Sequence, residues 1–534
     1  MAIDNLLWWQ RGIIYQIYPR SFMDSNGDGI GDLAGITSKL DYLDWLGIGA
    51  IWLSPICPSP MVDFGYDVSD YTDVDPIFGT LADFDELIHE AHRREIRVIF
   101  DFVPNHSSDQ HPWFRESRAS RDNPKRDWYI WRDARPDGTP PNNWLSTFGG
   151  SGWTWDEQTG QYYFHEFFEQ QPDLNWRNPE VRAAMYDALR FWLDRGVDGF
   201  RLDAVWFLMK DERLRDNPPN PLYSRDMSPN QRLVPAYSSD RHDMFAVLRE
   251  MRAVMDEYDN RLLIGELYLP IDRLIAYYGP TGEILQLPHN FHLLRQPWDA
   301  LHIRATIDLY EGRLPDFAWP NWVLSNHDNP RIASRIGPGQ ARVAAMLLLT
   351  LRGTPTLYYA DELGLPDVDI PSDLMQDPEE HTMPGQHLGR DPERTPMQWD
   401  ASPHAGFTSA TPWLPVSHDY TTLNVASQRN DPHSMLTMQQ RLIALRRSEP
   451  ALTYGLYTPV LSDGDLIAYT RELGNSAFLI VLNLGSRPQE LSLARLGRQG
   501  KIALNTRLDR EGEVVSGSIA LRGDEGMVIS LDQP

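Results

Sequence analysis

The sequence is poor in cysteine and in positive charge, and it lacks long hydrophobic runs. Cys57 is its one cysteine, so an intramolecular disulfide is excluded, as is usual for proteins of reducing compartments. Lys and Arg number 49 against 75 Asp and Glu, which gives a net charge of -26. This negative charge argues against nucleic acids and anionic membranes as partners.

Segments that direct a chain to or across a membrane are also missing from the sequence. No apolar stretch approaches the roughly 20 residues of a transmembrane helix. Residues 1–10 lack the basic segment and the apolar core of a signal peptide. We therefore expect a cytoplasmic protein with no membrane partner, and its oligomeric state stays open.

What the sequence does contain is polar residues inside apolar segments. Residues 199–205 form a strand-like run that carries Arg201 and Asp203, which lie on one face because side chains alternate along a strand. Burying such a pair is costly unless the charges satisfy each other or serve a function. The alternative is a core ion pair that only fixes strand register.

The same combination recurs in three further segments. An apolar run ends in Asp101 and His106, another contains Glu266, and a third ends in His327 and Asp328. Polar residues at the carboxyl ends of several buried strands are typical of a barrel whose active site lies at that face. This repetition favours a functional site over four separate core ion pairs.

Strand-like and helix-like segments alternate along most of the chain, which at 534 residues is too long for a single core. The alternation predicts an α/β fold, a (β/α)8 TIM barrel. The expected strands include residues 12–19, 50–55, 199–205, 262–267, 283–287, 321–328 and 356–359, with a further strand that ends at Asp101. The final barrel helix is expected at residues 435–448.

Two regions depart from this alternation. Residues 107–178 are rich in Trp, Gly, Pro and Asn, which predicts a domain inserted after the third strand. From residue 456 only short alternating strands appear, which predicts a C-terminal antiparallel β-sandwich. The expected domains are a barrel of residues 1–106 and 179–455, with an excursion at about 365–419, an insertion of 107–178 and a C-terminal domain of 456–534.

Taken in order, these motifs resemble those of the α-amylase family of glycoside hydrolases, and the resemblance covers essentially the whole chain. Residues 101–106, 199–204, 265–266 and 326–328 are similar to its four motifs. Residues 171–175, Gln-Pro-Asp-Leu-Asn, resemble a further motif of the α-glucosidase and oligo-1,6-glucosidase subgroup. The resemblance implies the barrel and a B domain inserted after its third strand.

The carboxyl residues have the pattern that glycosidic bond hydrolysis requires. This reaction uses two carboxyl groups, one as proton donor and one as nucleophile or base. We expect Arg201 to lower the pKa of Asp203, which suits a nucleophile, and an apolar setting to raise the pKa of Glu266, which suits an acid. The resemblance implies the same two roles and adds Asp328 as a third catalytic carboxylate.

The resemblance also implies which residues contact the substrate. They are Asp63, Tyr66, Asp101, His106, Phe148, Phe167, Arg201, His327 and Arg394. Arg394 would pair with Asp63 across the pocket and close it beyond the non-reducing glucose. Phe148 and Phe167 would form aromatic walls, although each is equally explained as core of the inserted domain.

Oxygen-bearing residues alternate in the loop after the first expected strand. The loop predicts a Ca²⁺ or Mg²⁺ site with side-chain ligands Asp24, Asn26, Asp28 and Asp32 and the carbonyl of Ile30. The twelfth residue of the loop, counted from Asp24, is Gly35, whereas an EF-hand has Glu there, so this is no EF-hand. The loop resembles the small metal loop of the α-glucosidases. The alternative is an Asp- and Gly-rich turn without metal. We expect no organic cofactor.

The expected function is that of a retaining, exo-acting α-glucosidase that acts on short α-glucosides and also transfers glucose to acceptors. Because Ala204 follows the expected nucleophile, and 1,6-specific relatives tend to carry Val there, we expect α-1,4 bonds to be preferred. The alternatives are an α-1,6-glucosidase, or a glucosyltransferase or isomerase of the same family. A remote alternative is a non-catalytic, transporter-associated relative.

Overall fold

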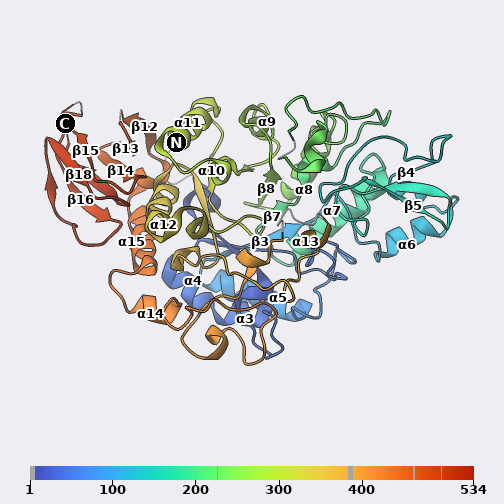
Figure 1. The fold of residues 1–534 in the computed structure, drawn as a ribbon, viewed down its shortest axis with the longest axis horizontal. Helices are drawn as coiled ribbons and strands as arrows, with labels where there is room; N and C mark the ends of the chain where they lie inside the picture. The colour runs from blue at the N-terminus through green and yellow to red at the C-terminus, as the bar shows by residue number, and fades with distance from the viewer. Residues whose placement is uncertain (1–5, 225–226, 383–388, 461–462, 495, 534) are drawn as a thin grey trace.

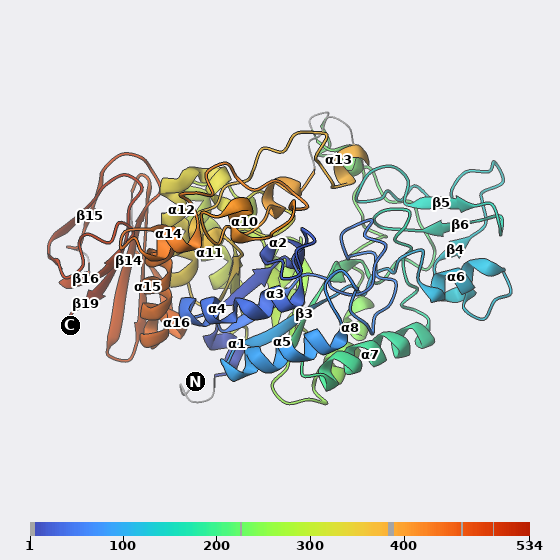
Figure 2. The same ribbon diagram turned by 90° about the horizontal axis from the view of Figure 1, so that it is seen from below.

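The computed structural model describes residues 6–224, 227–382, 389–460, 463–494 and 496–533. Figures 1 and 2 show a central barrel, with the C-terminal strands at one end of the molecule and strands β4, β5 and β6 at the other. Within these described ranges, no helix is both long enough and apolar enough to cross a membrane.

The barrel consists of eight parallel strands, which confirms the predicted fold class. Their order around the barrel is β10-β11-β1-β2-β3-β7-β8-β9. They are β1 (Ile14–Ile17), β2 (Ala50–Leu53), β3 (Arg97–Phe102), β7 (Gly199–Leu202), β8 (Leu262–Leu267), β9 (Leu287–Asn290), β10 (Asn321–Val323) and β11 (Thr354–Tyr358). The strands are almost wholly buried, because helices cover the outside of a parallel barrel and side chains fill its inside.

The barrel closes between β9 and β10 through a side chain. Asn321 in β10 accepts a hydrogen bond from the Asn290 N–H at 2.8 Å and donates one to the Pro288 carbonyl at 2.5 Å. The sixth strand was expected at residues 283–287, which is wrong, because β9 begins at Leu287. Glu283 lies in a turn instead, where its carboxylate accepts the Thr281 N–H at 3.0 Å.

The helices follow the strands as the alternation predicted. The helices are α1 (Trp8–Arg11), α2 (Pro19–Phe22), α3 (Leu33–Ser38), α4 (Leu40–Leu46), α5 (Leu81–Arg93), α6 (Pro112–Ala119), α7 (Pro179–Asp194), α8 (Met244–Met255), α9 (Ile271–Ala276), α10 (His292–Arg295), α11 (Ala300–Arg313), α12 (Ile332–Thr350), α13 (Glu379–Thr382), α14 (Val425–Arg429), α15 (Met435–Ser448) and α16 (Pro450–Tyr454). The expected helix at residues 435–448 is confirmed as α15. Helix α7 begins after Asn178, whose side chain accepts the Glu180 N–H and so satisfies one free donor of the first turn.

A small antiparallel sheet lies in the stretch between β3 and α7. Its strands are β4 (Trp131–Arg132), β5 (Trp153–Asp156) and β6 (Gln161–Phe164), in the order β4-β6-β5. Trp144, Trp153 and Phe164 form a separate hydrophobic cluster there. The two ends of the stretch return to the barrel, since the Leu174 N–H donates to the Asn105 carbonyl at 2.9 Å.

Two antiparallel sheets form the C-terminal part of the chain. The larger has the order β12-β13-β14-β19-β16-β17, and the smaller pairs β15 with β18. These strands are β12 (Leu456–Val460), β13 (Leu466–Leu473), β14 (Ser476–Asn483), β15 (Gln489–Ser492), β16 (Gly500–Asn505), β17 (Val514–Val515), β18 (Ser518–Leu521) and β19 (Gly526–Leu531). Side chains of both sheets, among them Leu479, Ile519 and Ile529, share one hydrophobic core. The domain boundaries themselves stay predictions.

Candidate active site

A cavity of about 310 Å³ opens at the carboxyl ends of the barrel strands. Glu266 lies in β8, Asp203 follows the last residue of β7, and Asp328 lies in the loop after β10. The cavity is lined by Asp63, Tyr66, His106, Thr147, Phe148, Phe167, Asp203, Trp206, Phe207, Glu266, Tyr268, Arg295, His327, Asp328, Asn329, Glu379 and Arg390. All three predicted catalytic carboxylates therefore meet in one cavity.

Arg201 lies beneath this cavity and is fully buried. Its Nη1 atom lies 2.7 Å from Asp203 Oδ1 and 2.9 Å from Asp101 Oδ1, and its Nη2 atom lies 3.0 Å from Glu266 Oε1. One guanidinium thus serves three buried carboxyl groups. Full ionisation would leave two uncompensated negative charges in a desolvated site, which favours retention of protons within the cluster.

This sharing overturns the expected pKa of Asp203. Burial raises the pKa of Asp203 well above its ordinary value, against the attraction of Arg201 and with a further increase from Glu266. Burial likewise raises the pKa of Glu266, as expected, and raises that of Asp101 to about 6. The expectation for Asp203 was wrong because it counted one neighbouring cation and missed the burial of the carboxyl group and the two other carboxyl groups beside it.

The backbone after Asp203 turns sharply. Ala204 has φ 47° and ψ 33°, so it lies outside the strand in the left-handed region, and strand alternation does not decide where its side chain points. This conformation directs the Ala204 N–H to Glu266 Oε2 at 2.9 Å. Left-handed backbone is costly for residues with a Cβ atom and is often retained at functional sites.

Asp328 is surrounded by two arginines and a histidine. Arg394 Nη2 lies 3.0 Å and Arg390 Nη1 lies 3.4 Å from Asp328 Oδ1, and His327 Nε2 lies 3.3 Å from Oδ2. Burial acts to raise the pKa of Asp328, but His327, Arg390 and Arg394 outweigh it and lower this pKa to about 2. Asp328 is therefore a stable anion at neutral pH.

The cation opposite Asp63 is Arg390, and the expected pairing with Arg394 is wrong. Arg390 Nη2 lies 2.8 Å from Asp63 Oδ1, and the same guanidinium makes two bonds to Asp377, at 2.7 and 2.9 Å. Arg394 instead donates to the His327 carbonyl at 2.7 Å. The two arginines are four residues apart, and only the path of the loop decides which one reaches Asp63.

Tyr66 connects the aromatic and the carboxylate parts of the cavity. Its hydroxyl donates to Asp101 Oδ2 at 3.2 Å and lies 2.6 Å from His327 Nε2, and its ring stacks on His327 with an interplanar angle of 1°. His106 Nε2 lies 3.1 Å from the amide nitrogen of Gln171, within the subgroup motif. Burial lowers the pKa of both His106 and His327 to about 3, so both rings are neutral.

Aromatic side chains form one wall of the cavity. Phe148 and Phe167 both line it, and their ring centroids lie 5.4 Å apart. The lining residues that the sequence analysis did not identify are Thr147, Trp206, Phe207, Tyr268, Arg295, Asn329, Glu379 and Arg390. Trp206, Phe207 and Tyr268 follow the motif carboxylates by two to four residues, and this proximity is the signal that could have found them. Nothing comparable marks Arg390.

The loop predicted to bind a metal forms many bonds of its own. Asp24 accepts the N–H groups of Asn26, Gly27 and Gly29 and the hydroxyl of Thr408. Asp32 caps α3 by accepting the Gly35 N–H at 2.6 Å. In the described part of the chain, no three His, Cys, Asp or Glu side chains are grouped to hold a metal ion. The metal site stays a prediction.

Comparison with known proteins places this site in a family. The alpha amylase catalytic domain matches residues 16–455. The chain is 45% identical over 507 residues to a probable alpha-glucosidase of Rhizobium meliloti (strain 1021), covering 92% of each chain. It is 40% identical over 520 residues to an oligo-1,6-glucosidase of Parageobacillus thermoglucosidasius, covering 90% of this chain and 91% of that one.

Solved structures agree with these matches. The alpha-glucosyl transfer enzyme XgtA superposes with a TM-score of 0.92 at 41% identity, covering 99% of this chain and 100% of XgtA. The fold and the clustered carboxyl groups thus define a glycoside hydrolase. The chain belongs to the α-amylase family, in the subgroup of the α-glucosidases and oligo-1,6-glucosidases.

Proposed function

We propose that the protein is an exo-acting α-glucosidase that cleaves terminal α-glucosidic bonds of short oligosaccharides with retention of configuration. The observation that carries this proposal is the pair Asp203 and Glu266, which share Arg201 at 2.7 and 3.0 Å. Two carboxyl groups this close to one guanidinium suit the short separation of retaining enzymes, about 5 Å, better than the wider separation of inverting ones.

The proposed reaction begins with proton transfer from Glu266 to the glycosidic oxygen. The raised pKa of Glu266 favours the protonated form that a proton donor requires. Asp203 then attacks the anomeric carbon as the bond to the leaving sugar breaks. Asp203 reacts as its carboxylate beside Arg201, and the proton that its raised pKa favours passes to Asp101, which contacts the same Arg201 Nη1 atom. Water subsequently attacks the glycosyl ester and gives its proton to Glu266.

Asp328 and the neutral histidines would hold the glucose ring. Asp328 accepts hydrogen bonds from sugar hydroxyls as an anion and stabilises the positive charge that develops in the transition state. Uncharged His106 and His327 donate to hydroxyls without placing a competing cation near that charge. In this proposal Tyr66 stacks beside the ring, as it already stacks on His327.

The exo mode of action rests on the cations and carboxylates at the far end of the cavity. Asp63, Arg390 and Asp377 form a continuous ion-pair network there, and the Arg390 guanidinium lies 5.4 Å from the Phe148 ring centroid. Such a network blocks extension of the glucan chain beyond the terminal glucose. A cavity of about 310 Å³ suits one hexose better than a long chain.

Stereochemistry is the direct test of the retaining mechanism. Proton NMR of the first product from maltose should show α-glucose before mutarotation. Initial β-glucose would contradict the role of Asp203 as nucleophile. A second candidate function is glucosyl transfer, which is favoured by the similarity to a solved structure named an alpha-glucosyl transfer enzyme. The ratio of glucose to p-nitrophenol released from p-nitrophenyl α-glucoside would separate hydrolysis from transfer.

We also propose that the loop of residues 24–32 binds Ca²⁺ or Mg²⁺ in a structural role. Alternating Asp24, Asn26 and Asp28 oxygens support this proposal, since hard cations prefer oxygen ligands. Elemental analysis should find one ion per chain, and EDTA should lower the melting temperature. The wild-type protein is the right sample, because Asp24→Ala would weaken the loop even without a metal.

A further inference from the structure

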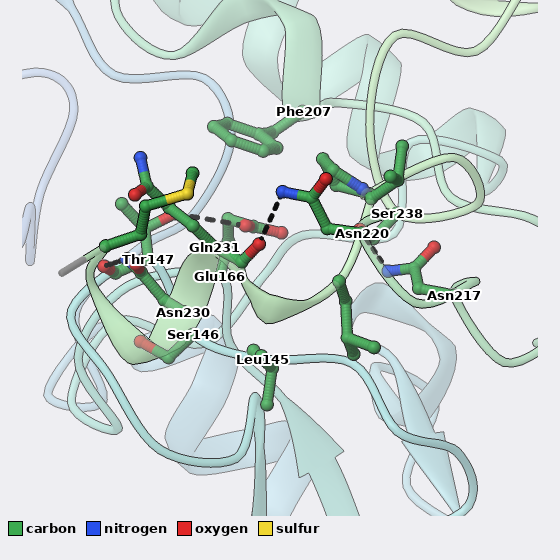
Figure 3. A pocket seen from close by; sticks show the side chains of 14 residues that line it. Leu145, Ser146, Thr147, Glu166, Phe207, Asn217, Asn220, Asn230, Gln231 and Ser238 are labelled. Carbon is green, nitrogen blue, oxygen red and sulfur yellow. Dashed lines mark hydrogen bonds between the residues drawn. The ribbon is translucent and has the colours of Figure 1, made fainter. Parts of the chain in front are cut away.

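A second cavity of about 360 Å³ lies beside the active site and shares two lining residues with it, Thr147 and Phe207. Figure 3 shows Phe207 above this cavity, Leu145 below it, and Glu166 between them. We call it the Glu166 pocket, lined among others by Ser146, Thr147, Glu166, Phe207, Asn220 and Asn230. Phe207 belongs to the short helix η3 (Val205–Phe207), which directly follows Asp203 and Ala204.

Two oxygen atoms in this pocket have no hydrogen-bond partner among the described residues. Glu166 is 3% exposed, and among the described residues its Oε2 atom has no hydrogen-bond partner. Lys210 Nζ lies 3.6 Å from that atom, within ion-pair distance but beyond hydrogen-bond distance, and it lies closer to Asp173, at 2.8 Å. The Oδ1 atom of Asn230 is likewise buried and unpartnered within the described ranges. Buried polar atoms without partners are uncommon and call for an explanation.

The groups around these atoms are already fixed in place. Thr147 donates its hydroxyl to Glu166 Oε1 at 3.2 Å, and Asn230 donates its amide to the Thr147 carbonyl at 2.5 Å. Asn220 donates to the Gln231 carbonyl at 2.8 Å. A ligand could therefore bond to these two oxygens without any rearrangement of the hydrogen bonds around them.

The chemistry of the pocket favours a hydroxyl-bearing ligand over a metal cation. Burial raises the pKa of Glu166 to about 8, although Lys210 opposes this, so the carboxyl is mostly neutral at pH 7. A neutral carboxyl both donates and accepts, which matches a hydroxyl group, whereas hard cations require several ionised or carbonyl oxygens. Apolar Phe207, Leu233 and Val234 also line the pocket and suit the C–H face of a sugar.

We infer that the Glu166 pocket binds a polyhydroxyl group, a sugar or polyol, that forms the distal part of the leaving group or of a glucosyl acceptor. The inference rests on the proposed glucosidase function and extends it to a second binding site. In transfer, the ester bond between Asp203 and the anomeric carbon breaks, and an acceptor oxygen bonds to that carbon. The acceptor hydroxyl proton passes to Glu266, so no further reactant is needed.

The test uses two pocket variants and a matched control. Glu166→Gln and Asn230→Ala remove or alter the two unpartnered oxygens. Glu169→Gln is the control, because Glu169 is exposed and carries the same change three residues away. Transfer from p-nitrophenyl α-glucoside to sorbitol is measured as the ratio of p-nitrophenol to glucose released over a range of sorbitol concentrations.

We expect wild type and Glu169→Gln to show saturable transfer with equal half-saturation concentrations. Each pocket variant should raise that concentration about five- to tenfold, the effect of one lost hydrogen bond. Unchanged half-saturation in both pocket variants, or a linear, unsaturable response in wild type, would overturn the inference. Absence of p-nitrophenol release by wild type would instead refute the proposed function.

Calorimetric titration with sorbitol tests the pocket without turnover. Binding that weakens at least fivefold in Glu166→Gln and in Asn230→Ala, but not in Glu169→Gln, supports the inference. Equal binding in all four proteins, or no binding to wild type, overturns it. Circular dichroism and melting temperature establish that each variant is folded before the titration is interpreted.

Discussion

The active site has a floor and a rim, and both arrange carboxylates around a guanidinium, yet the chain builds them by different means. The floor consists of Asp101, Arg201, Asp203 and Glu266, which lie in strands or directly after them. The rim consists of Asp63, Asp377, Glu379 and Arg390, which lie outside the barrel strands. The sequence motifs predicted all four floor residues, but of the rim residues they predicted only Asp63.

Strand register explains why the floor residues could be predicted from the sequence. Asp101 and Arg201 are direct partners in the β3–β7 pairing, and Arg201 is opposite Ile264 in the β7–β8 pairing. Because side chains alternate along a strand, Glu266 points to the same side of the barrel wall as Ile264, the residue opposite Arg201. Once parallel strands are aligned, their polar residues must meet. The rim residues have no such periodic constraint.

Loss of Asp203, the proposed nucleophile, should give the largest effect. Asp203→Asn keeps the side-chain shape and the contact to Arg201 but removes the oxygen proposed to attack the substrate. We expect kcat for p-nitrophenyl α-glucoside to fall by about 10⁴-fold or more, with an unchanged circular dichroism spectrum. Activity within tenfold of wild type would show that the floor is a core ion-pair cluster and that the reaction occurs elsewhere.

Rim substitutions should mainly affect substrate binding. Arg390→Lys retains a positive charge but loses the two-point contact with Asp377 and the bond to Asp63. We expect the KM for maltose to rise roughly 10- to 100-fold, the effect of one or two lost charge-assisted bonds. Steady-state kinetics on maltose measure this change.

Arg394→Lys is the matched comparison for Arg390→Lys. Arg394 contacts Asp328 and the His327 carbonyl, so its substitution should lower kcat more than it raises KM. If instead Arg394→Lys raised KM and Arg390→Lys had no effect, the originally expected pairing of Arg394 with Asp63 would hold in solution, and the rim described here would be wrong.

Asp101 in the floor and Asp328 beside Arg394 should differ in the sign of their pH dependence. Asp101 has a folded-state pKa raised to about 6, so its contribution to stability is present at low pH and is lost as pH rises from about 4 to 6. Asp328 has a pKa lowered to about 2, so its contribution, about 2 kcal/mol, is present above pH 4 and is lost as pH falls toward 2.

Chemical denaturation from pH 2.5 to 7 measures these contributions. The stability of wild type relative to Asp101→Asn should fall as pH rises through 6, and that relative to Asp328→Asn should fall as pH drops below 4. If stability changed in the same direction with pH for both variants, the opposite pKa shifts assigned to Asp101 and Asp328 would be wrong.

The sequence predicted the barrel, the three carboxylates and Arg201 because each depends on local patterns that strand pairing then assembles. It failed for the pKa of Asp203, because burial and three-way sharing of Arg201 exist only in the folded state. It failed for Arg390, because Arg390 and Arg394 are alike in type and only four residues apart. The Glu166 pocket is lined by residues near β6 and by residues in and after η3. These segments are separated in the sequence, and no sequence motif predicts that they meet.

Ala204 lies where the floor ends, and its substitution should give the smallest effect. We expect the unmodified enzyme to cleave maltose faster than isomaltose, and Ala204→Val to shift the ratio of kcat/KM toward isomaltose. A change of one or two methyl groups discriminates by about 1–3 kcal/mol. Measurement of kcat/KM for both disaccharides under one condition gives the ratio.

Ala204→Gly separates bulk from backbone geometry. Ala204 has φ 47°, and its N–H holds Glu266 Oε2 at 2.9 Å, so the β-branched Val strains this turn and should lower kcat for both substrates. Gly relieves the strain without adding bulk and should leave maltose preferred. If Gly shifted the ratio as Val does, the position of Glu266 and not the size of residue 204 would decide the linkage. If wild type preferred isomaltose, the rim and not Ala204 would set the specificity.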